Sequence, residues 1–224
     1  MTSEREIYVN KCLPYTKTQA PRLQSLWNCA ELIKKYGLTG SLVETGVYKG
    51  GSSMLMGYAL EHFKMDNEVI MLDTFAGMTR PTEHDYKIKS IKKNNTLEKW
   101  ESKQQDGYNE WSYGSYDEVK TNFEKTGHKN FRMIKGDVLK TIPFKVGDIA
   151  ILRMDTDWYE STLHTIKHLF PYLQDGGFLI VDDYNCWAGS KKAVDEYFGM
   201  HKLSKKEIVP VDHSCVVYQK GGQR

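Results

Sequence analysis

The sequence predicts a single α/β domain built on a parallel, doubly wound sheet whose last strand is antiparallel. Three observations predict it. Short apolar runs typical of buried strands alternate along the chain with segments of helical periodicity. Glycines follow several of these runs, where a strand turns into a helix. The length of 224 residues suffices for one domain with a substantial core, so residues 1–224 are expected to form one unit.

The first predicted helix is Pro21–Tyr36, which lies in an N-terminal helical extension over residues 1–40. Its apolar side chains recur at helical spacing. Pro21 suits the first turn of a helix, and Gly37 suits its C-terminal cap. We therefore expect an amphipathic helix that leads into the core.

A glycine-rich turn follows the first predicted strand. Ser41–Val47 has the composition of a buried strand, and Ser52–Phe63 that of the helix after it. A second strand is expected at Glu68–Asp73 and a third at Phe131–Lys135, each followed by or ending in a polar residue. Ligands bind beyond the carboxyl ends of strands in such sheets, so these ends are the candidate site.

A long polar insertion separates the second and third strands. Residues 79–114 show little apolar periodicity and are expected to form a lid beside the ligand site that determines which substrate is bound. The basic run Lys87–Lys93 fits a solvated, mobile segment better than a phosphate or nucleic-acid site.

The C-terminal half continues the alternation of strands and helices. Two of its apolar runs end in pairs of carboxylates. The expected elements are a strand at Asp148–Asp155, a helix at Tyr159–Leu173, a strand from Phe178 to the acidic pair, a helix at Ser190–Phe198, and strands at Glu207–Val211 and Ser214–Lys220.

Composition excludes several classes of protein. Apolar residues make up 40% and charged residues 27%, with a net charge of +2, which predicts a soluble protein with no nucleic-acid or membrane partner. No signal peptide or membrane span is expected, so the predicted location is cytoplasmic. The cysteines lack zinc-ligand spacing and are interpreted as buried free thiols; they are Cys12, Cys29, Cys186 and Cys215.

The turn E-T-G-V-Y-K-G-G-S, residues 44–52, indicates a nucleoside-containing cofactor. Its glycines allow close approach of a ligand, and the Glu44 carboxylate suits an amino-acid ammonium. The spacing G-x-x-x-G-G disfavours a dinucleotide, whose pyrophosphate needs G-x-G-x-x-G. Asp73 ends the second strand, where an acid can accept hydrogen bonds from ribose, and Gly136 and Asp137 could border an adenine.

Four carboxylates indicate a metal site. Asp155 and Asp157 follow one buried strand, and Asp182 and Asp183 follow another that should be its neighbour. Oxygen ligands favour Mg²⁺, Mn²⁺ or Ca²⁺. The paired aspartates can share an ion only if the strand breaks at Asp183, because successive side chains of a strand point apart. The alternative for a single aspartate is a helix N-cap. His164 and His168 are assigned no role.

Several motifs together resemble the macrocin O-methyltransferase (TylF-like) family. They are R-M-D-T-D-W-Y-E-S-T at Arg153–Thr162 and G-G-F-L-I-V-D-D-Y at Gly176–Tyr184, supported by V-E-T-G-V-Y-K-G-G-S-S, L-D-T-F-A-G-M and K-A-V-D-E-Y-F. The resemblance implies a class I methyltransferase fold, which is a Rossmann-like three-layer sandwich with a seven-stranded sheet. It also implies S-adenosyl-L-methionine as donor, Mg²⁺, and a hydroxyl acceptor on a sugar, glycan or glycosylated natural product. A homodimer is a possible assembly.

Family roles carry over to matching positions of this sequence. The resemblance implies Asp155, Asp182 and Asp183 as metal ligands and Asp157 as the general base. Val138 stands where the family commonly has an aromatic residue. The implied cofactor-binding residues are Glu44, Thr45, Gly46, Tyr48, Gly51, Ser52, Asp73, Thr74, Ser115, Gly136, Asp137 and Asp155.

Three other functions compete with this interpretation. A catechol or small-phenol O-methyltransferase is the nearest. A nicotinamide-dependent oxidoreductase is disfavoured because the dinucleotide fingerprint is missing. A non-catalytic metabolite-binding domain would leave the cost of four convergent acids unexplained.

Overall fold

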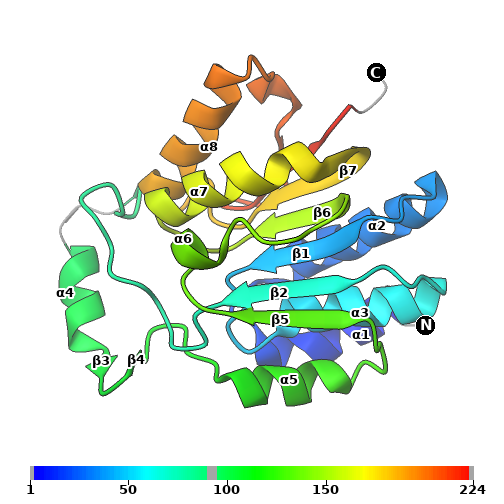
Figure 1. Ribbon diagram of the computed structural model, residues 1–224, viewed down its shortest axis with the longest axis horizontal. Coiled ribbons are helices and arrows are strands. Elements are labelled where there is room, and N and C mark those ends of the chain that lie inside the picture. Colours follow the sequence, from blue (N-terminus) through cyan, green and yellow to red (C-terminus); the bar gives the residue numbers. More distant parts are fainter. Residues whose placement is uncertain (1–2, 90–94, 222–224) are drawn as a thin grey trace.

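A computed structural model describes residues 3–89 and 95–221 and shows one seven-stranded sheet between two layers of helices (Figure 1). The strand order is β5-β2-β1-β6-β7-β9-β8. The first five of these strands are parallel, β9 is antiparallel to β7, and β8 is antiparallel to β9. The predicted α/β class is therefore confirmed. The strands are β1 Ser41–Thr45, β2 Val69–Asp73, β5 Phe131–Lys135, β6 Ile149–Met154, β7 Leu173–Val181, β8 Val209–Pro210 and β9 Val216–Gln219.

Helices cover both faces of the sheet (Figure 1). One face carries α1 Glu4–Cys12, α2 Ala20–Tyr36, α3 Gly51–Phe63 and α5 Tyr116–Glu124. The other carries α6 Val138–Thr141, α7 Tyr159–Leu169 and α8 Ala188–Met200. Short 3₁₀ turns are η1 Leu13–Tyr15, η2 Phe170–Tyr172 and η3 Lys205–Glu207.

Alternating side chains of each central strand fill two separate cores. Leu42 of β1 packs with α1, α2, α3 and α5, whereas the next residue, Val43, packs with α7 and α8. In β7, Ile180 likewise packs in the first core and Leu179 in the second. Because both faces are buried, these strands appear in the sequence as continuous apolar runs.

The ends of the three central strands lie at one level of the sheet. Thr45 is paired with Met154, and Met154 with Val181. The Asp155 N–H donates to the Thr45 carbonyl at 2.8 Å, and the Asp182 N–H donates to the Met154 carbonyl at 3.0 Å. The residues that follow these strands are thereby held side by side at the carboxyl edge of the sheet.

The polar insertion contains more regular structure than its sequence indicates. It holds α4 Asn95–Ser102 and a small hairpin of β3 Gln104–Gln105 with β4 Tyr108–Asn109. Trp100 Nε1 donates to the Met78 carbonyl at 2.8 Å, which ties α4 to the chain after β2. Residues 90–93 of the basic run lie outside the described residues. In Figure 1 the insertion stands beside the carboxyl edge of the sheet.

Some element boundaries differ from the prediction. The helix predicted over Tyr159–Leu173 ends at Leu169, because a 3₁₀ turn containing Pro171 follows it. Strand β7 consequently begins at Leu173, before its glycines. Helix α5 was not predicted, since only its buried Val119, Asn122 and Phe123 mark an inner face.

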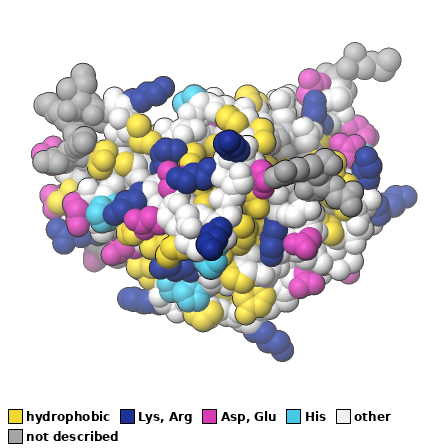
Figure 2. Space-filling view, turned by 90° about the horizontal axis from the view of Figure 1, so that it is seen from above, with side chains coloured by type: hydrophobic (Ala, Val, Ile, Leu, Met, Phe, Trp, Pro, Cys, Tyr) yellow, Lys and Arg dark blue, Asp and Glu magenta, His cyan; other side chains and the backbone are white. Residues whose placement is uncertain are grey.

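The surface shows charges of both signs. On the face drawn in Figure 2, basic, acidic and apolar side chains are interspersed, in keeping with the net charge of +2. Within residues 3–89 and 95–221, no helix has the length and apolar character needed to cross a membrane.

Candidate active site

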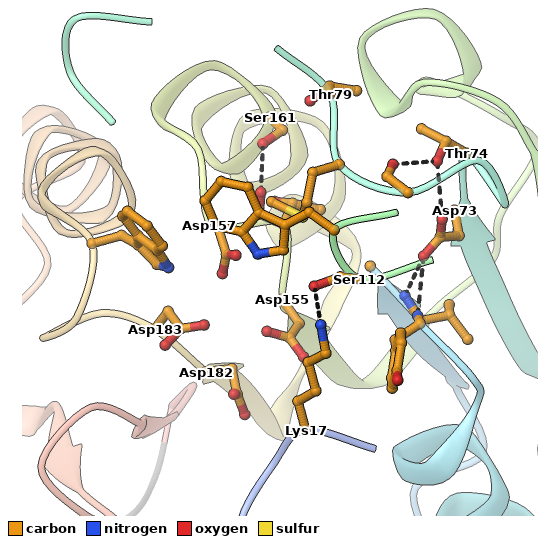
Figure 3. A pocket seen from close by; sticks show the side chains of 18 of the residues that line it. Lys17, Asp73, Thr74, Thr79, Ser112, Asp155, Asp157, Ser161, Asp182 and Asp183 are labelled. Atoms are coloured by element: carbon orange, nitrogen blue, oxygen red, sulfur yellow. Dashed lines mark hydrogen bonds between the residues drawn. The ribbon is translucent and has the colours of Figure 1, made fainter. Parts of the chain in front are cut away.

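A cavity of about 320 Å³ opens at the carboxyl ends of β1, β2, β6 and β7 (Figure 3). Its floor is made by residues that follow these strands. Its remaining walls come from four other parts of the chain: the segment between η1 and the first turn of α2, the polar insertion, the turn between β5 and α6, and the loop between β7 and α8. This is where a parallel sheet is expected to bind ligands.

Three carboxylates converge in this cavity. Each of Asp155, Asp157 and Asp183 offers an oxygen, and these oxygens all lie within 4.8 Å of one another. In Figure 3 the three side chains face a common space between β6 and β7. Strand β7 ends at Val181, so the chain has left the strand at Asp183, as sharing an ion required.

Asp157 has the features of a ligand-binding group. Its backbone is in the left-handed region with φ of 63°, an uncommon conformation for a residue other than glycine. Its Oδ1 is buried and has no hydrogen-bond partner. It is not a helix cap, because the N-cap of α7 is Trp158 and no side chain caps that helix. A buried, unpartnered carboxylate oxygen is costly unless something binds it.

The carboxylates repel one another. Burial raises the pKa of Asp155 well above its ordinary value, and the charge of Asp182 raises it further despite the opposing Arg153. Burial likewise raises the pKa of Asp157, with further repulsion from Asp183. A bound cation would remove this repulsion, so the three-carboxylate group fits a divalent metal.

Asp182 is engaged differently from its neighbour. Thr18 Oγ1 donates to both of its oxygens, at 3.1 and 3.0 Å. Arg22 Nη1 lies 2.6 Å from Oδ2, and Arg153 Nη2 lies 2.5 Å from Oδ1. The structure therefore does not bring Asp182 into the converging group, although its side chain lines the same cavity.

Arg153 is the electrostatic centre beneath the cavity. Its side chain is 2% exposed and lies 2.5 Å from Glu44 and 2.9 Å from Asp155, in addition to its bond to Asp182. Burial alone would lower the pKa of this guanidinium, but Asp182, Asp155 and Glu44 together raise it well above its ordinary range. One permanent cation thus pairs with three acids, of which Glu44 and Asp182 are buried.

Glu44 belongs to β1 and lies beneath the glycine-rich turn that follows this strand. It shares the β1 face of Leu42, which looks toward α3, and its carboxylate accepts hydrogen bonds from Ser52 and Ser53 at the start of that helix. The side chain is completely buried. It supports the turn from below and does not line the cavity, where direct contact with an ammonium was expected.

Asp73 organises the same turn from β2. One of its oxygens accepts from the N–H groups of Val47 at 2.6 Å and Tyr48 at 3.2 Å, and the other accepts from Phe75 at 2.8 Å. Gly46 has φ of +80°, and an added Cβ there would collide with the Asp155 carbonyl oxygen. The turn consequently needs glycine for its conformation and for its close approach to β6.

Most predicted site residues do line the cavity. Asp137 caps α6 by accepting from the Leu139 N–H at 3.0 Å and still faces the cavity. The predicted residues in the lining are Gly46, Tyr48, Ser52, Asp73, Thr74, Gly136, Asp137, Asp155, Asp157, Asp182 and Asp183. Those outside it are Glu44, Thr45, Gly51 and Ser115. Ser115 is instead the N-cap of α5, where its hydroxyl accepts from Glu118 N–H at 3.2 Å.

Several site residues were not predicted. Lys17, Thr18 and Arg22 reach the cavity from the segment before α2 and from its first turns. That segment carries no motif that marks it. One signal was available for the ion-pair network: Arg153 interrupts the buried apolar strand DIAILRMD, and a charge there must have partners.

Three of the four cysteines are buried as predicted, whereas Cys186 is half-buried and lines the cavity. All four cysteines are free, and burial raises the pKa of both Cys12 and Cys29 to about 12, which makes them unreactive thiols. His164 Nε2 contacts the Ile142 carbonyl at 2.8 Å, and His168 Nδ1 contacts the His164 carbonyl at 3.0 Å. Neither histidine lines the cavity.

Comparison with known proteins identifies relatives over nearly the whole chain. The family described as Macrocin-O-methyltransferase (TylF) matches residues 10–220. Demethyldecarbamoylnovobiocin O-methyltransferase of Streptomyces niveus is 32% identical over 216 residues, which covers 92% of this chain and 76% of the relative. Mycinamicin III 3''-O-methyltransferase of Micromonospora griseorubida is 31% identical over 222 residues, covering 92% and 78%. The solved structure of the O-methyltransferase NovP superposes with a TM-score of 0.79 at 31% identity, covering 92% of this chain and 82% of that one.

Proposed function

This chain belongs to the macrocin O-methyltransferase (TylF) family and is an S-adenosylmethionine-dependent O-methyltransferase, and we propose that it methylates a sugar hydroxyl with the help of a divalent cation. The observation that carries the proposal is the group formed by Asp155, Asp157 and Asp183 in the cavity, whose oxygens lie within 4.8 Å of one another.

The donor would lie along the turn after β1 and the end of β2. Gly46, Tyr48 and Ser52 line that part of the cavity and would face the amino-acid portion. Asp73 and Thr74 would face the ribose, and Gly136 and Asp137 the adenine. Glu44 acts from below, by fixing Ser52 through a hydrogen bond, and so has a positioning role.

Asp155 and Asp183 would hold the cation, with Mg²⁺, Mn²⁺ or Ca²⁺ suited to their oxygen ligands. Once bound, such an ion lowers the pKa of a hydroxyl that approaches it and stabilises the developing negative charge. Asp182 anchors this side of the cavity through Arg22 and Arg153, since its oxygens are already engaged. Mg²⁺ sites commonly use only one or two carboxylates, so two ligands suffice.

Asp157 would accept the acceptor proton. Its Oδ1 has no partner in the protein and is the free basic atom of the group. The methyl carbon of a sulfonium is already electrophilic, so the protein must align the acceptor oxygen behind it and remove the proton. Alignment of this kind lowers a barrier by up to about 7–11 kcal/mol, and a positioned base contributes about 10²–10⁴-fold.

The acceptor side of the cavity is aromatic. Trp111, Trp158 and Trp187 lie with ring centroids 5.0 to 6.0 Å apart, and Trp111 and Trp187 line the cavity. Such a wall suits the apolar face of a sugar and also a flat phenol. The macrocin O-methyltransferase family of this chain, and its relative that acts on the 3''-oxygen of mycinamicin III, favour a sugar hydroxyl over a catechol as the acceptor.

Methyl transfer from radiolabelled S-adenosylmethionine to a panel of methyl glycosides and catechols tests this function. We expect transfer to a glycoside, its loss in excess EDTA, and its recovery on addition of Mg²⁺ or Mn²⁺. Calorimetric titration with S-adenosylhomocysteine and with NAD, run on the same preparation, should show binding of the former alone. Full turnover in EDTA would contradict metal activation, and binding of NAD would contradict the cofactor.

A further inference from the structure

The cavity is lined by basic side chains as well as by carboxylates. Three lysines line it: Lys17 from the segment before α2, Lys87 from the insertion, and Lys99 from α4. Among the described residues, none of the three has a carboxylate within ion-pair distance of its ammonium. Arg22 and Arg153, by contrast, each form ion pairs with at least two carboxylates.

The two lysines of the insertion stand on the aromatic wall. Lys99 Nζ lies 3.7 Å from the ring centroid of Trp111, and Lys87 Nζ lies 5.6 Å from that of Trp187. The two indole rings adjoin, with centroids 6.0 Å apart. Two ammonium groups are thus presented over one continuous aromatic surface.

Backbone pairing fixes Lys87 at this place. Lys87 forms an isolated antiparallel β-bridge with Trp187. On either side of it, the Ile88 N–H donates to the Cys186 carbonyl at 2.9 Å, and the Ala188 N–H donates to the Tyr86 carbonyl at 2.9 Å. The lysine is therefore held at the cavity by the same loop that follows the metal-binding carboxylates.

Lys17 is the third lysine of the cavity and points toward Asp155 (Figure 3). Burial lowers its pKa, while the charges of Asp157 and Asp155 raise it. Its Nζ donates to Ser112 Oγ at 3.0 Å and lies 4.8 Å from the Tyr48 ring centroid. Burial lowers the pKa of Lys99, and repulsion from Lys87 and Lys17 lowers it further. The charge of Asp157 offsets part of this lowering. An anion bound between Lys87 and Lys99 would relieve the repulsion between these two ammonium groups.

We propose that the acceptor is an anionic sugar derivative whose phosphate is bound by Lys87 and Lys99 over the tryptophan wall, while its hydroxyl meets Asp155, Asp157 and Asp183. A neutral glycoside would use the aromatic wall and the carboxylates but would make no charged contact with these two exposed ammonium groups. Lysine is a common point-charge partner of phosphate, and its attraction also steers anionic ligands into a cavity. This inference deepens the proposed function and rests on it.

Calorimetry on the full chain with Mg²⁺ and S-adenosylhomocysteine present tests the inference. The probes are methyl glucoside, glucose 1-phosphate, UDP and UDP-glucose, so that a sugar phosphate and a nucleotide-linked sugar are distinguished. We expect the phosphate-bearing probes to bind more tightly than methyl glucoside. Lys87→Met and Lys99→Met should each weaken phosphate binding about tenfold and leave methyl glucoside unaffected. Lys120→Met, an exposed change on α5, is the matched control.

Three results would overturn the inference: equal affinity for neutral and phosphate probes, lysine variants that bind phosphate as the wild type does, or variants whose main defect is in binding S-adenosylhomocysteine. Each leaves the proposed methyl transfer intact. Failure of that function would show differently, as absence of both S-adenosylhomocysteine binding and methyl transfer in the wild-type protein.

Discussion

Arg153→Met should lower the free energy of unfolding by about 3–5 kcal/mol, the cost of removing one partner of a buried ion pair. The reason is that Glu44, Asp155 and Asp182 would lose the cation that lies within 2.5 to 2.9 Å of each of them. Glu44 and Asp182 could not recover this loss by moving into water, since Glu44 is fully buried and Asp182 is 3% exposed. Denaturant unfolding followed by circular dichroism measures the change.

A surface arginine supplies the matched control. Arg132 of β5 forms an ion pair with Glu68 at 3.1 Å, and its side chain is 38% exposed. Arg132→Met should therefore cost only about 0–1 kcal/mol. Arg153→Lys keeps the charge without the forked donors and should fall between the two. A loss below about 1 kcal/mol for Arg153→Met would contradict the role given to this residue as the centre of the site.

Asp157→Asn should lower kcat for methyl transfer by about 10²–10⁴-fold. An asparagine keeps one side-chain oxygen and nearly the same shape, but it cannot take up a proton at neutral pH. The left-handed backbone at this position, with φ of 63°, also tolerates asparagine well. Single-turnover kinetics with saturating donor and acceptor isolate the chemical step from binding.

Two measurements keep this prediction specific to proton transfer. S-adenosylhomocysteine affinity should stay at the wild-type value, because Asp157 is placed away from the Asp73 side of the cavity (Figure 3). Asp117→Asn, an exposed change in the first turn of α5, should leave the rate unchanged. A variant at position 157 that turns over near the wild-type rate would show that another group accepts the proton.

The acidic half of the site could be predicted because it depends on strand ends. The runs before Asp155 and Asp182 are too apolar to be anything but buried, and parallel neighbours end at the same edge of a sheet. Convergence of the carboxylates followed from topology alone. The different surroundings of Asp182 and Asp183 could not be predicted in this way. They depend on Arg22 and Thr18, which bind Asp182 from 160 and 164 positions away in the chain.

The contacts of Glu44 and of the polar insertion could not be predicted from local sequence patterns. Glu44 was expected to touch the ligand, yet its alternate position along β1 turns it toward Ser52 and Ser53 of α3. The sequence does not say which face of a doubly covered strand meets a ligand. The insertion was likewise predicted only as polar chain, since Trp100 and Asn109 become ordered through tertiary hydrogen bonds and not through periodicity.

The central claim is that the carboxylate group in the cavity holds one divalent cation, and titration with Mn²⁺ followed by electron paramagnetic resonance tests it most directly. With S-adenosylhomocysteine present, the wild-type protein should bind one ion tightly per chain. Asp183→Asn should abolish that binding, while Asp175→Asn, an exposed change at the opposite end of β7, should preserve it. Absence of a stoichiometric Mn²⁺ site in the wild-type protein, or an unchanged site in Asp183→Asn, would contradict the account.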